Sequence, residues 1–371
     1  MKKLLTSVAL AAATVASFAQ NVTISGQMDA GMSSLRAQDG TASKDEILGN
    51  GASTSFIAFE ATEDLGGGLK AGMKGVNLIS ATSGLTSNGS TAYSTSNFFN
   101  DEIWVGLSGS FGGIKLGSPH AGMYETNGKA TPYGTALGGG YSSSGINRLL
   151  GSTTTLGVNQ FVGGVAANGR VIRSEKSVRY DTPVISGFSG SLTKAFQNDQ
   201  SSTATSNSND FTDATINYTN GPLNVAYSAV RVAAGDVAAQ GNNAASALIA
   251  GSSVDYRYLA ANYKIANNLT VYYGQTTGQT AGLSNNRDIG SQSVAVKYGV
   301  TPAVDLMASI VAVKDNSASS AKDQSLKSVS AHYNFSKRTS AYATVQDYDT
   351  DMSSDTAGQV TQYIVGLRHK F

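Results

Sequence analysis

The sequence predicts an all-β fold, an antiparallel barrel, and three observations support this. First, apolar and polar side chains alternate along most of the chain, as in "SVAVKYG" and "SVSAHYNF", and a period of two is typical of strands. Second, the 371 residues include 42 glycines and 17 tyrosines but only 5 prolines, a composition that favours strands joined by turns. Third, an aromatic residue recurs just before a short turn, at intervals of 35 to 45 residues.

The chain begins with "MKKLLTSVALAAATVASFAQ", which is typical of a secretory signal peptide. Two lysines precede an apolar run, and small residues occupy the expected cleavage site. The run is too short to cross a membrane as a helix, which disfavours an N-terminal anchor. We therefore expect residues 1–19 to be a signal peptide and residues 20–371 to form the exported domain.

Alternation begins with the first expected strand, "VTISGQMDAG". It places Val22, Ile24 and Met28 on one face and Gln27 and Asp29 on the other. Similar segments follow to the end of the chain, separated alternately by short turns and by long polar loops rich in Ser, Asn and Gly. At about 22 residues per strand with its connection, the exported domain has room for about 16 strands, an even number as in outer-membrane barrels.

The recurring aromatic residues share a position, because each ends the apolar face of a strand next to a short turn. Tyrosine and phenylalanine prefer the interface between a membrane and water, and transmembrane barrels carry such girdles. The series consists of Tyr180, Tyr218, Tyr263, Tyr298, Phe335 and Phe371.

The last strand, "QYIVGLRHKF", ends on an apolar ring without a polar tail. In a closed barrel the last strand pairs with the first, so that no edge is left free. Phe371 is then the terminal girdle residue and assembly signal. A secreted β-sandwich or solenoid would also alternate, but the repeated aromatic residue before each short turn favours the barrel.

Composition limits the other function classes. Lysine and arginine total 26 against 25 acidic residues, so there is no electrostatic signature of nucleic-acid binding. The absence of cysteine removes thiol catalysis and cysteine-ligated metals. The three histidines have no metal-ligand spacing, so we expect no metal and no cofactor.

An enzymatic function is not expected. His332, between Ser330 and Asn334 on one strand face, is the one histidine placed to act as a base for a serine nucleophile. Small polar residues are, however, the ordinary lining of a barrel. The glycine-rich "EDLGGGLKAG" lacks the Gly-Lys-Ser/Thr of a phosphate-binding loop and predicts a turn.

Six segments in register resemble the trimeric general porins of Gram-negative outer membranes: "NVTISGQMDAG", "TEDLGGGLKA", "WVGLSGSFGGIKLG", "SVRYDTP", "YNFSKRTSAYATVQ" and "VGLRHKF". The ending is that of the branch whose members finish in Gly-Leu-Arg-His-x-Phe. The resemblance implies a 16-stranded transmembrane barrel and a homotrimer, surrounded by outer-membrane lipid and lipopolysaccharide. It also implies passive diffusion of ions and small hydrophilic solutes, with the third loop, residues 118–170, folded inward as a constriction.

The sequence departs from these porins at positions where they carry basic side chains in the lumen. Phe56, Asp101 and Ser118 occupy positions at which the resemblance implies arginine, and Glu60 one at which it implies lysine. Because lumen charges control ion entry, we expect a weakly selective or cation-preferring pore, unless loop charges compensate. The predicted pore-lining and constriction residues are Phe56, Glu60, Asp101, Ser118, Glu125, Lys129, Arg148, Arg173 and Arg179.

Two alternatives stay open. Aromatic residues in the constriction would suit a solute-specific porin with an aromatic-lined passage, and the candidates are Phe56, Tyr124, Tyr133 and Tyr141. A surface protein whose long loops serve adhesion would also carry this pattern. Saturable block by one solute class would favour the first alternative, and a purified protein that fails to conduct would favour the second.

Overall fold

The structure is a computed structural model. It describes residues 21–37, 43–49, 51–84, 98–133, 173, 176–195, 209–234, 253–281, 286, 288–316, 323–350 and 359–371. The predicted signal peptide lies outside these residues.

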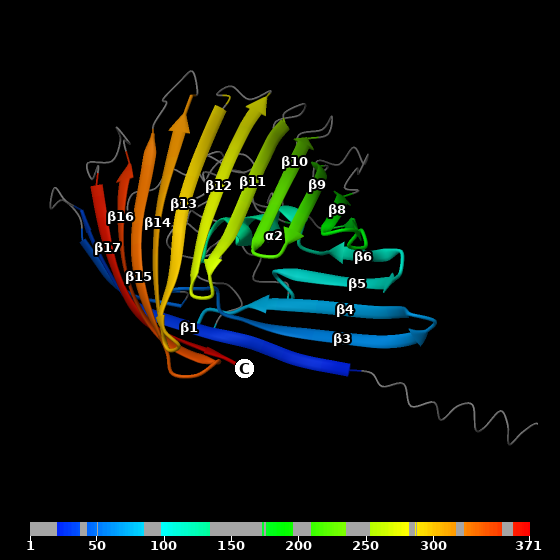
Figure 1. The fold of residues 1–371 in the computed structure, drawn as a ribbon, viewed down its shortest axis with the longest axis horizontal. Coiled ribbons are helices and arrows are strands. Elements are labelled where there is room, and N and C mark those ends of the chain that lie inside the picture. Colours follow the sequence, from blue (N-terminus) through cyan, green and yellow to red (C-terminus); the bar gives the residue numbers. More distant parts are fainter. Residues whose placement is uncertain are drawn as a thin grey trace, which may run out of the picture.

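Nearly all of the described chain is strand (Figure 1). The first elements are β1 (Asn21–Ala37), β2 (Ser43–Leu48), β3 (Phe56–Gly66), β4 (Leu69–Leu78), β5 (Glu102–Gly109), β6 (Gly112–Ser118), helix α2 (Gly122–Ala130), β7 (Ser177–Asp181) and β8 (Phe188–Ala195). The remaining strands are β9 (Asn209–Asn220), β10 (Leu223–Ala234), β11 (Ser253–Ala266), β12 (Leu269–Ala281), β13 (Asp288–Thr301), β14 (Val304–Asp315), β15 (Gln324–Asn334), β16 (Thr339–Thr350) and β17 (Gln359–Lys370).

The strands form a closed antiparallel barrel. From β3 to β17 each strand pairs with the next one along the chain. Strand β1 closes the circuit, because Asn21–Gln27 pairs with β3 and Gln27–Ala37 pairs with β17. None of the helices in the described segments has the length and apolar character needed to cross a membrane.

The second barrel strand is interrupted. Strands β2 and β3 both pair with β1, β2 with Gly31–Arg36 and β3 with Asn21–Gln27. Together they occupy one position in the barrel, so the seventeen strand segments make the sixteen barrel strands that the sequence predicts. Between the two halves, residues 51–55 lie outside the strands.

Asp29 holds this interruption in place. Its carboxylate accepts hydrogen bonds from the amides of Gly51 (2.8 Å), Ala52 (3.1 Å) and Ser53 (3.1 Å). The Tyr342 hydroxyl of β16 donates a fourth at 2.6 Å. Backbone amides that leave a sheet need other partners, and the fully buried Asp29 supplies them. Residues 51–53 are therefore anchored on the inner face of the barrel.

The barrel closes at Gly26 and Phe371. The Phe371 amide donates to the Gly26 carbonyl at 3.0 Å, and the Gly26 amide donates back to the Phe371 carbonyl at 3.2 Å. The Phe371 ring lies over Gly26, where an added Cβ would be 2.6 Å from the ring carbon Cζ. Glycine at position 26 therefore makes room for the terminal aromatic residue.

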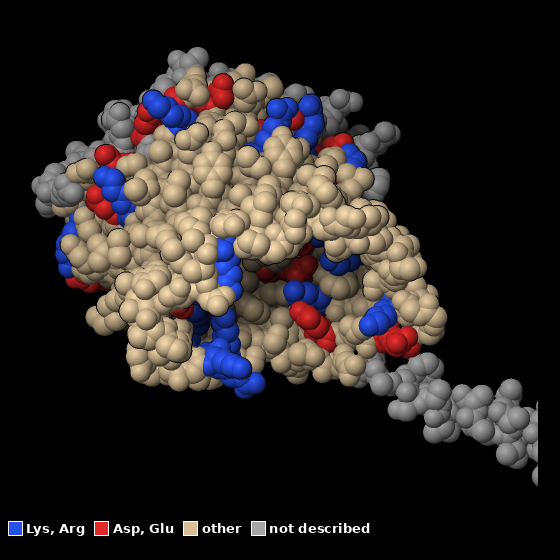
Figure 2. Space-filling view, viewed as in Figure 1, with Lys and Arg blue, Asp and Glu red and all other residues tan. Residues whose placement is uncertain are grey.

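Polar side chains face the lumen, and apolar side chains face outward. Ser228, Thr276 and Ser330 are among the buried inner residues, whereas Val105 (58% exposed) and Leu116 (50% exposed) lie on the outer face. In Figure 2 a broad surface without charged side chains crosses the molecule, and acidic and basic side chains gather at the upper rim and inside a hollow. A soluble protein buries its apolar side chains, whereas a barrel in a membrane turns them outward to the lipid and keeps polar side chains inside.

The predicted aromatic series lies on the outer face. Tyr180, Tyr263, Tyr298, Phe335 and Phe371 are 37% to 63% exposed. Tyr218, the remaining member, is half-buried because the Phe188 ring packs against it at 4.5 Å between centroids. Each residue stands at the end of the barrel where consecutive strands are joined by short turns. The girdle predicted from the spacing is thus present on the outer surface.

The closure geometry makes a testable prediction. Gly26→Val places a branched side chain beneath the Phe371 ring, and we expect a destabilisation of about 2 kcal/mol from overpacking. Urea unfolding followed by the fluorescence of Trp104, the single tryptophan, measures the change. Gly290→Ala is the matched control, because a Cβ there would lie 3.8 Å from the nearest atom, the carbonyl oxygen of Thr276. Equal midpoints for the two variants would contradict the prediction.

Candidate functional site

A short helix lies inside the barrel and narrows it (Figure 1). Strand β6 ends at Ser118, and the chain turns into α2 (Gly122–Ala130), which packs against the inner faces of β8 to β13. The resemblance implied an inward-folded third loop, and the first part of that loop is described here. Strand β7 begins at Ser177. Residues 134–172 lie outside the described chain.

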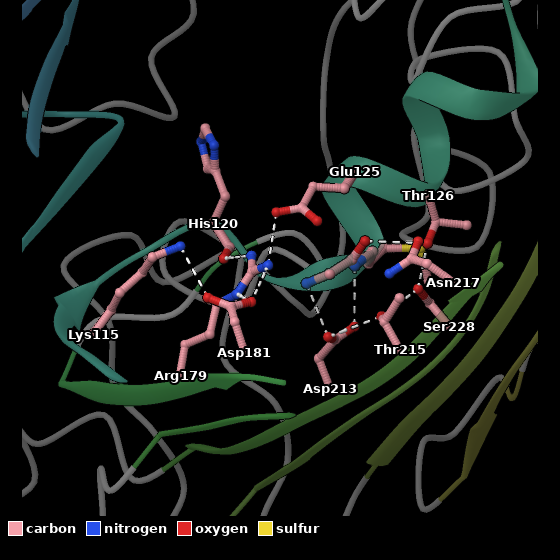
Figure 3. Close-up of polar contacts among 12 residues, drawn as sticks. Lys115, His120, Glu125, Thr126, Arg179, Asp181, Asp213, Thr215, Asn217 and Ser228 are labelled. Carbon is pink, nitrogen blue, oxygen red and sulfur yellow. Dashed lines mark hydrogen bonds and ion pairs between the residues drawn. The ribbon is translucent and has the colours of Figure 1, made fainter. Parts of the chain in front are cut away.

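Asp213 of β9 fixes the start of the helix. Its carboxylate accepts hydrogen bonds from the Gly122 amide at 2.9 Å and the Met123 amide at 3.2 Å, and Thr215 donates a third at 3.2 Å (Figure 3). The first amides of a helix have no partner within it, and they carry the positive end of the helix dipole. A carboxylate supplied by the barrel wall therefore caps the helix in place of a neighbouring residue.

Packing fixes the rest of the helix. The Thr126 and Ser228 hydroxyls lie 2.6 Å apart, and Met123 is fully buried among apolar residues of the inner wall such as Phe211 and Tyr258. A Cβ on Gly122 would approach Ser191 Oγ to 2.5 Å, so the helix lies as close to the wall as glycine allows. The helix therefore lies against the inner wall formed by β8 to β13.

Arg179 of β7 links the helix to the wall that faces the passage. Its guanidinium contacts Glu125 of α2 at 2.7 Å and Asp181 at 2.6 Å, and it donates to the His120 carbonyl at 2.6 Å (Figure 3). The Arg179 side chain is 5% exposed. Two predicted residues, Glu125 and Arg179, are therefore brought together as one ion pair.

A second group of charges surrounds His120. Asp101 pairs with Arg173 and lies 3.2 Å from His120 Nε2. Glu102 lies 3.6 Å from His120 Nδ1 and pairs with Lys74 at 3.2 Å. The His120 ring stacks on Tyr124, with 4.0 Å between centroids.

Strands β3 to β6 continue this lining toward the short turns. Lys74 also contacts Glu60 at 3.3 Å, and Trp104 Nε1 donates to Glu102 at 2.9 Å. Lys115 pairs with Asp181 at 3.0 Å and lies over the Trp104 ring, 5.2 Å from its centroid.

We call a set of described residues on this face the paired wall, because each of its basic members has a carboxylate partner. The basic members are Lys74, Lys115, Arg173 and Arg179, and the acidic members are Glu60, Asp101, Glu102, Glu125 and Asp181. The charges that replace the expected arginines are therefore largely compensated within the wall.

The other predicted residues are placed differently. Phe56 and Glu60 lie on the lumen face of β3, in the phase of Gln27 and Thr23 of β1. Ser118 pairs with Ile103 of β5, whose side chain is exposed on the outer face. In this register Ser118 shares the phase of Leu116, and the lumen phase of β6 falls on Lys115 and Gly117.

Lys129, on the last turn of α2, points away from the paired wall. Its Nζ donates to Asn217 at 2.8 Å, and burial lowers the pKa of Lys129 below its ordinary value. Arg148 lies outside the described residues.

The sequence reasoning missed Lys74, Glu102, Trp104, Lys115 and Asp213 as site residues. The sequence could have indicated them, because each alternates with apolar residues that face outward from the same strand. Charged residues in a membrane-spanning strand face the interior or a partner. Asp213 carries less of a signal, because the helix that it caps comes from 90 residues earlier in the chain.

The one arrangement considered for catalysis is not assembled here. The Ser330 hydroxyl lies 2.7 Å from the Thr344 hydroxyl, Asn334 donates to Asp305 at 3.2 Å, and His332 stacks on Tyr342. Within the described ranges, no group of three or more histidine and acidic side chains is arranged to hold a metal.

Comparison with known proteins gives one family. Residues 6–353 match the model of a family described as Gram-negative porin. The chain is 28% identical to the major outer membrane protein P.IB of Neisseria meningitidis serogroup B over the full length of both chains. It is 30% identical to the outer membrane porin protein 32 of Delftia acidovorans, over 60% of this chain and 58% of that protein.

Solved structures share the fold. The anion-selective porin from Comamonas acidovorans superposes with a TM-score of 0.74 at 21% identity, covering 95% of this chain and all of that one. A trimer form of OmpT from Vibrio cholerae gives 0.67 at 14% identity, with 95% and 100% covered. At these identities the likeness concerns the barrel architecture.

The role of Asp213 in holding helix α2 can be tested by removing the charge of this side chain. Asp213→Asn weakens the cap on Gly122 and Met123 by about 1 kcal/mol, so α2 should move more within the lumen. We expect larger current fluctuations of the open channel and more frequent partial closures in planar-bilayer recordings. Asp210→Asn, on the same strand but exposed and paired with Lys194, is the control. Equal noise in both variants would exclude a clamp at Asp213.

Proposed function

The chain belongs to the Gram-negative porin family and forms an outer-membrane β-barrel, and we propose that it conducts ions and small hydrophilic solutes by passive diffusion with weak ionic selectivity. The observation that carries this proposal is the paired wall beside helix α2. In this proposal solutes pass along that wall.

Charge compensation supports weak selectivity. An unpaired ring of one sign would exclude ions of the same sign, because a narrow pore is smaller than the Debye length of about 8 Å. Here Asp101 is matched by Arg173, and Glu60 shares Lys74 with Glu102. The acidic substitutions thus remove the basic character expected from the resemblance without creating an equally strong acidic one.

The aromatic-lined alternative has less support. Tyr133 is buried against Ala52, Met307, Tyr342 and Ile364, and Tyr124 packs on the apolar cluster beneath α2. Side chains committed to packing offer little free ring surface to a sugar or an aromatic acid. We therefore favour discrimination by size and charge over a stacking site.

We also propose a homotrimer in contact with outer-membrane lipid and lipopolysaccharide. The support is the family membership together with the trimer form of the Vibrio cholerae barrel. The exposed apolar side chains of the outer face, such as Val22, Ile24 and Met32, suit contact with lipid or with another barrel.

Selectivity is tested first at Asp101. Asp101→Asn leaves Arg173 without its carboxylate, and we expect the cation-to-anion permeability ratio to fall about twofold. The reversal potential under a tenfold KCl gradient across a planar bilayer measures the ratio. The control is Asp323→Asn, at an exposed position outside the strands. A reversal potential unchanged by Asp101→Asn would contradict control by the paired wall, and a wild-type protein that fails to conduct would refute the channel.

Assembly is tested separately by electrophoresis. Because a trimer would keep its subunits together until it is heated, we expect the unheated protein to migrate near three times the mass of the heated chain. Chemical crosslinking before heating should preserve that band. Migration at the monomer mass under both conditions would refute the trimer.

A further inference from the structure

The lumen wall opposite the paired wall carries a different charge pattern. Lys264 of β11, Lys297 of β13, and Arg368 and Lys370 of β17 all lie in the lumen phase of their strands. Their sequence neighbours Tyr263, Tyr298 and Leu367 are exposed on the outer face, which fixes that phase. We call these four residues the basic wall.

The strand register places the four groups along the stretch of wall from β11 to β17. Lys264 and Lys297 both pair with Thr270 of β12 and therefore lie two strands apart in one row, about 10 Å between Cα atoms. Arg368 and Lys370 alternate along β17 and share its inner face. Both Arg368 and Lys297 are close enough to interact electrostatically with Lys370.

The carboxylates near this wall are few. Asp305 pairs with Lys297 at 3.2 Å, and Asp29, which interacts electrostatically with Arg368, is engaged by the amides of residues 51–53. Arg368 makes a long contact of 3.5 Å with the Ser340 hydroxyl.

Within the described chain, no carboxylate lies at ion-pair distance from Lys264, Arg368 or Lys370. The basic members of the paired wall, by contrast, each have such a partner. The two walls therefore differ in net charge, and the basic one is positive.

The basic wall lies at one end of the pore. Lys297 precedes the short turn between β13 and β14 by a few residues, and Lys370 is the last residue of β17. Two more basic residues, Lys337 and Arg338, form the turn between β15 and β16. Basic side chains are also seen gathered in a file beside the hollow in Figure 2.

We propose that the basic wall is a docking site for small multivalent anions at the short-turn mouth, a proposal that rests on the channel function. Two lysine ammonium groups and one guanidinium can contact separate oxygens of a phosphate or a dicarboxylate, and arginine suits such oxygens in a bidentate manner. Monovalent anions touch one group at a time and pass. The site thus enriches multivalent anions at this mouth, while the paired wall sets the weak selectivity farther in.

The test is the side dependence of block by inorganic pyrophosphate. The wild-type porin is reconstituted in a planar bilayer in KCl, and pyrophosphate is added to either side. Because the chain has no cysteine, Ser110→Cys in the turn between β5 and β6 reports orientation by reaction with a bulky polyethylene glycol maleimide. We expect half-block from the short-turn side at about fivefold lower concentration than from the loop side.

Neutralisation identifies the wall. The triple variant Lys297→Gln, Arg368→Gln, Lys370→Gln should lose the fivefold side difference and keep KCl conductance. Lys44→Gln, Lys194→Gln, Lys314→Gln is the matched triple, because each lysine pairs with a carboxylate at the loop side; it should keep the difference. Lys370→Gln alone, should the triple variant misfold, is expected to halve it.

Two results would overturn the proposal. Equal block from both sides of the wild-type channel would mean that no anion docks at the short-turn mouth. A side difference that survives in the triple variant would place the docking elsewhere. In both cases an intact KCl conductance leaves the channel function standing, whereas a protein without conductance overturns both proposals.

Discussion

The structure depends on the hydrogen bonds that join the first barrel strand to the last. A membrane offers no partner to a free strand edge, so the sheet must close. Closure brings Gly26 against Phe371, and only a residue without a side chain leaves room there for the terminal ring. Once the circuit is complete, the period of two along every strand separates a lumen from a lipid-facing surface. The inward helix and the charged walls depend on this separation of the lumen from the lipid-facing surface.

Among the described residues, two segments leave the sheet on its inner side, and one buried carboxylate anchors each of them. Asp29 binds the amides of residues 51–53, and Asp213 binds the first amides of α2. Backbone that leaves a sheet must find new hydrogen-bond partners or lose free energy. A carboxylate can accept several amides at once, so one side chain per segment is sufficient. Tyr133, which follows α2, and Ala52 belong to one buried hydrophobic cluster. Parts of the chain that are distant in sequence therefore meet inside the barrel.

The charges inside the barrel divide into two walls with different consequences for a solute. On β3 to β7 acids and bases neutralise one another, and the passage beside α2 has little net field. On β11 to β17 the basic side chains outnumber their carboxylate partners near the short-turn mouth. A diffusing ion therefore meets a positive region and a compensated region in succession. The selectivity of such a pore depends on the local charge at each position along the pore axis. It does not depend on the total charge, which is +1 for the whole chain.

The sequence by itself determined the fold class, the number of barrel strands and the outward aromatic series, because the period of two and the spacing of residues such as Tyr263, Tyr298 and Phe371 are local properties. It also identified Glu125, Arg173 and Arg179 as candidates. The pairing of Arg179 with Glu125, the capping of α2 by Asp213 and the interruption of the second strand were decided by tertiary structure. Each of these joins residues separated by more than 20 positions, and the partner of a charge is set by the register of the closed sheet. The face on which Ser118 lies was also decided by tertiary structure, because a shift of one residue in the strand register moves a side chain from the lumen face to the lipid face.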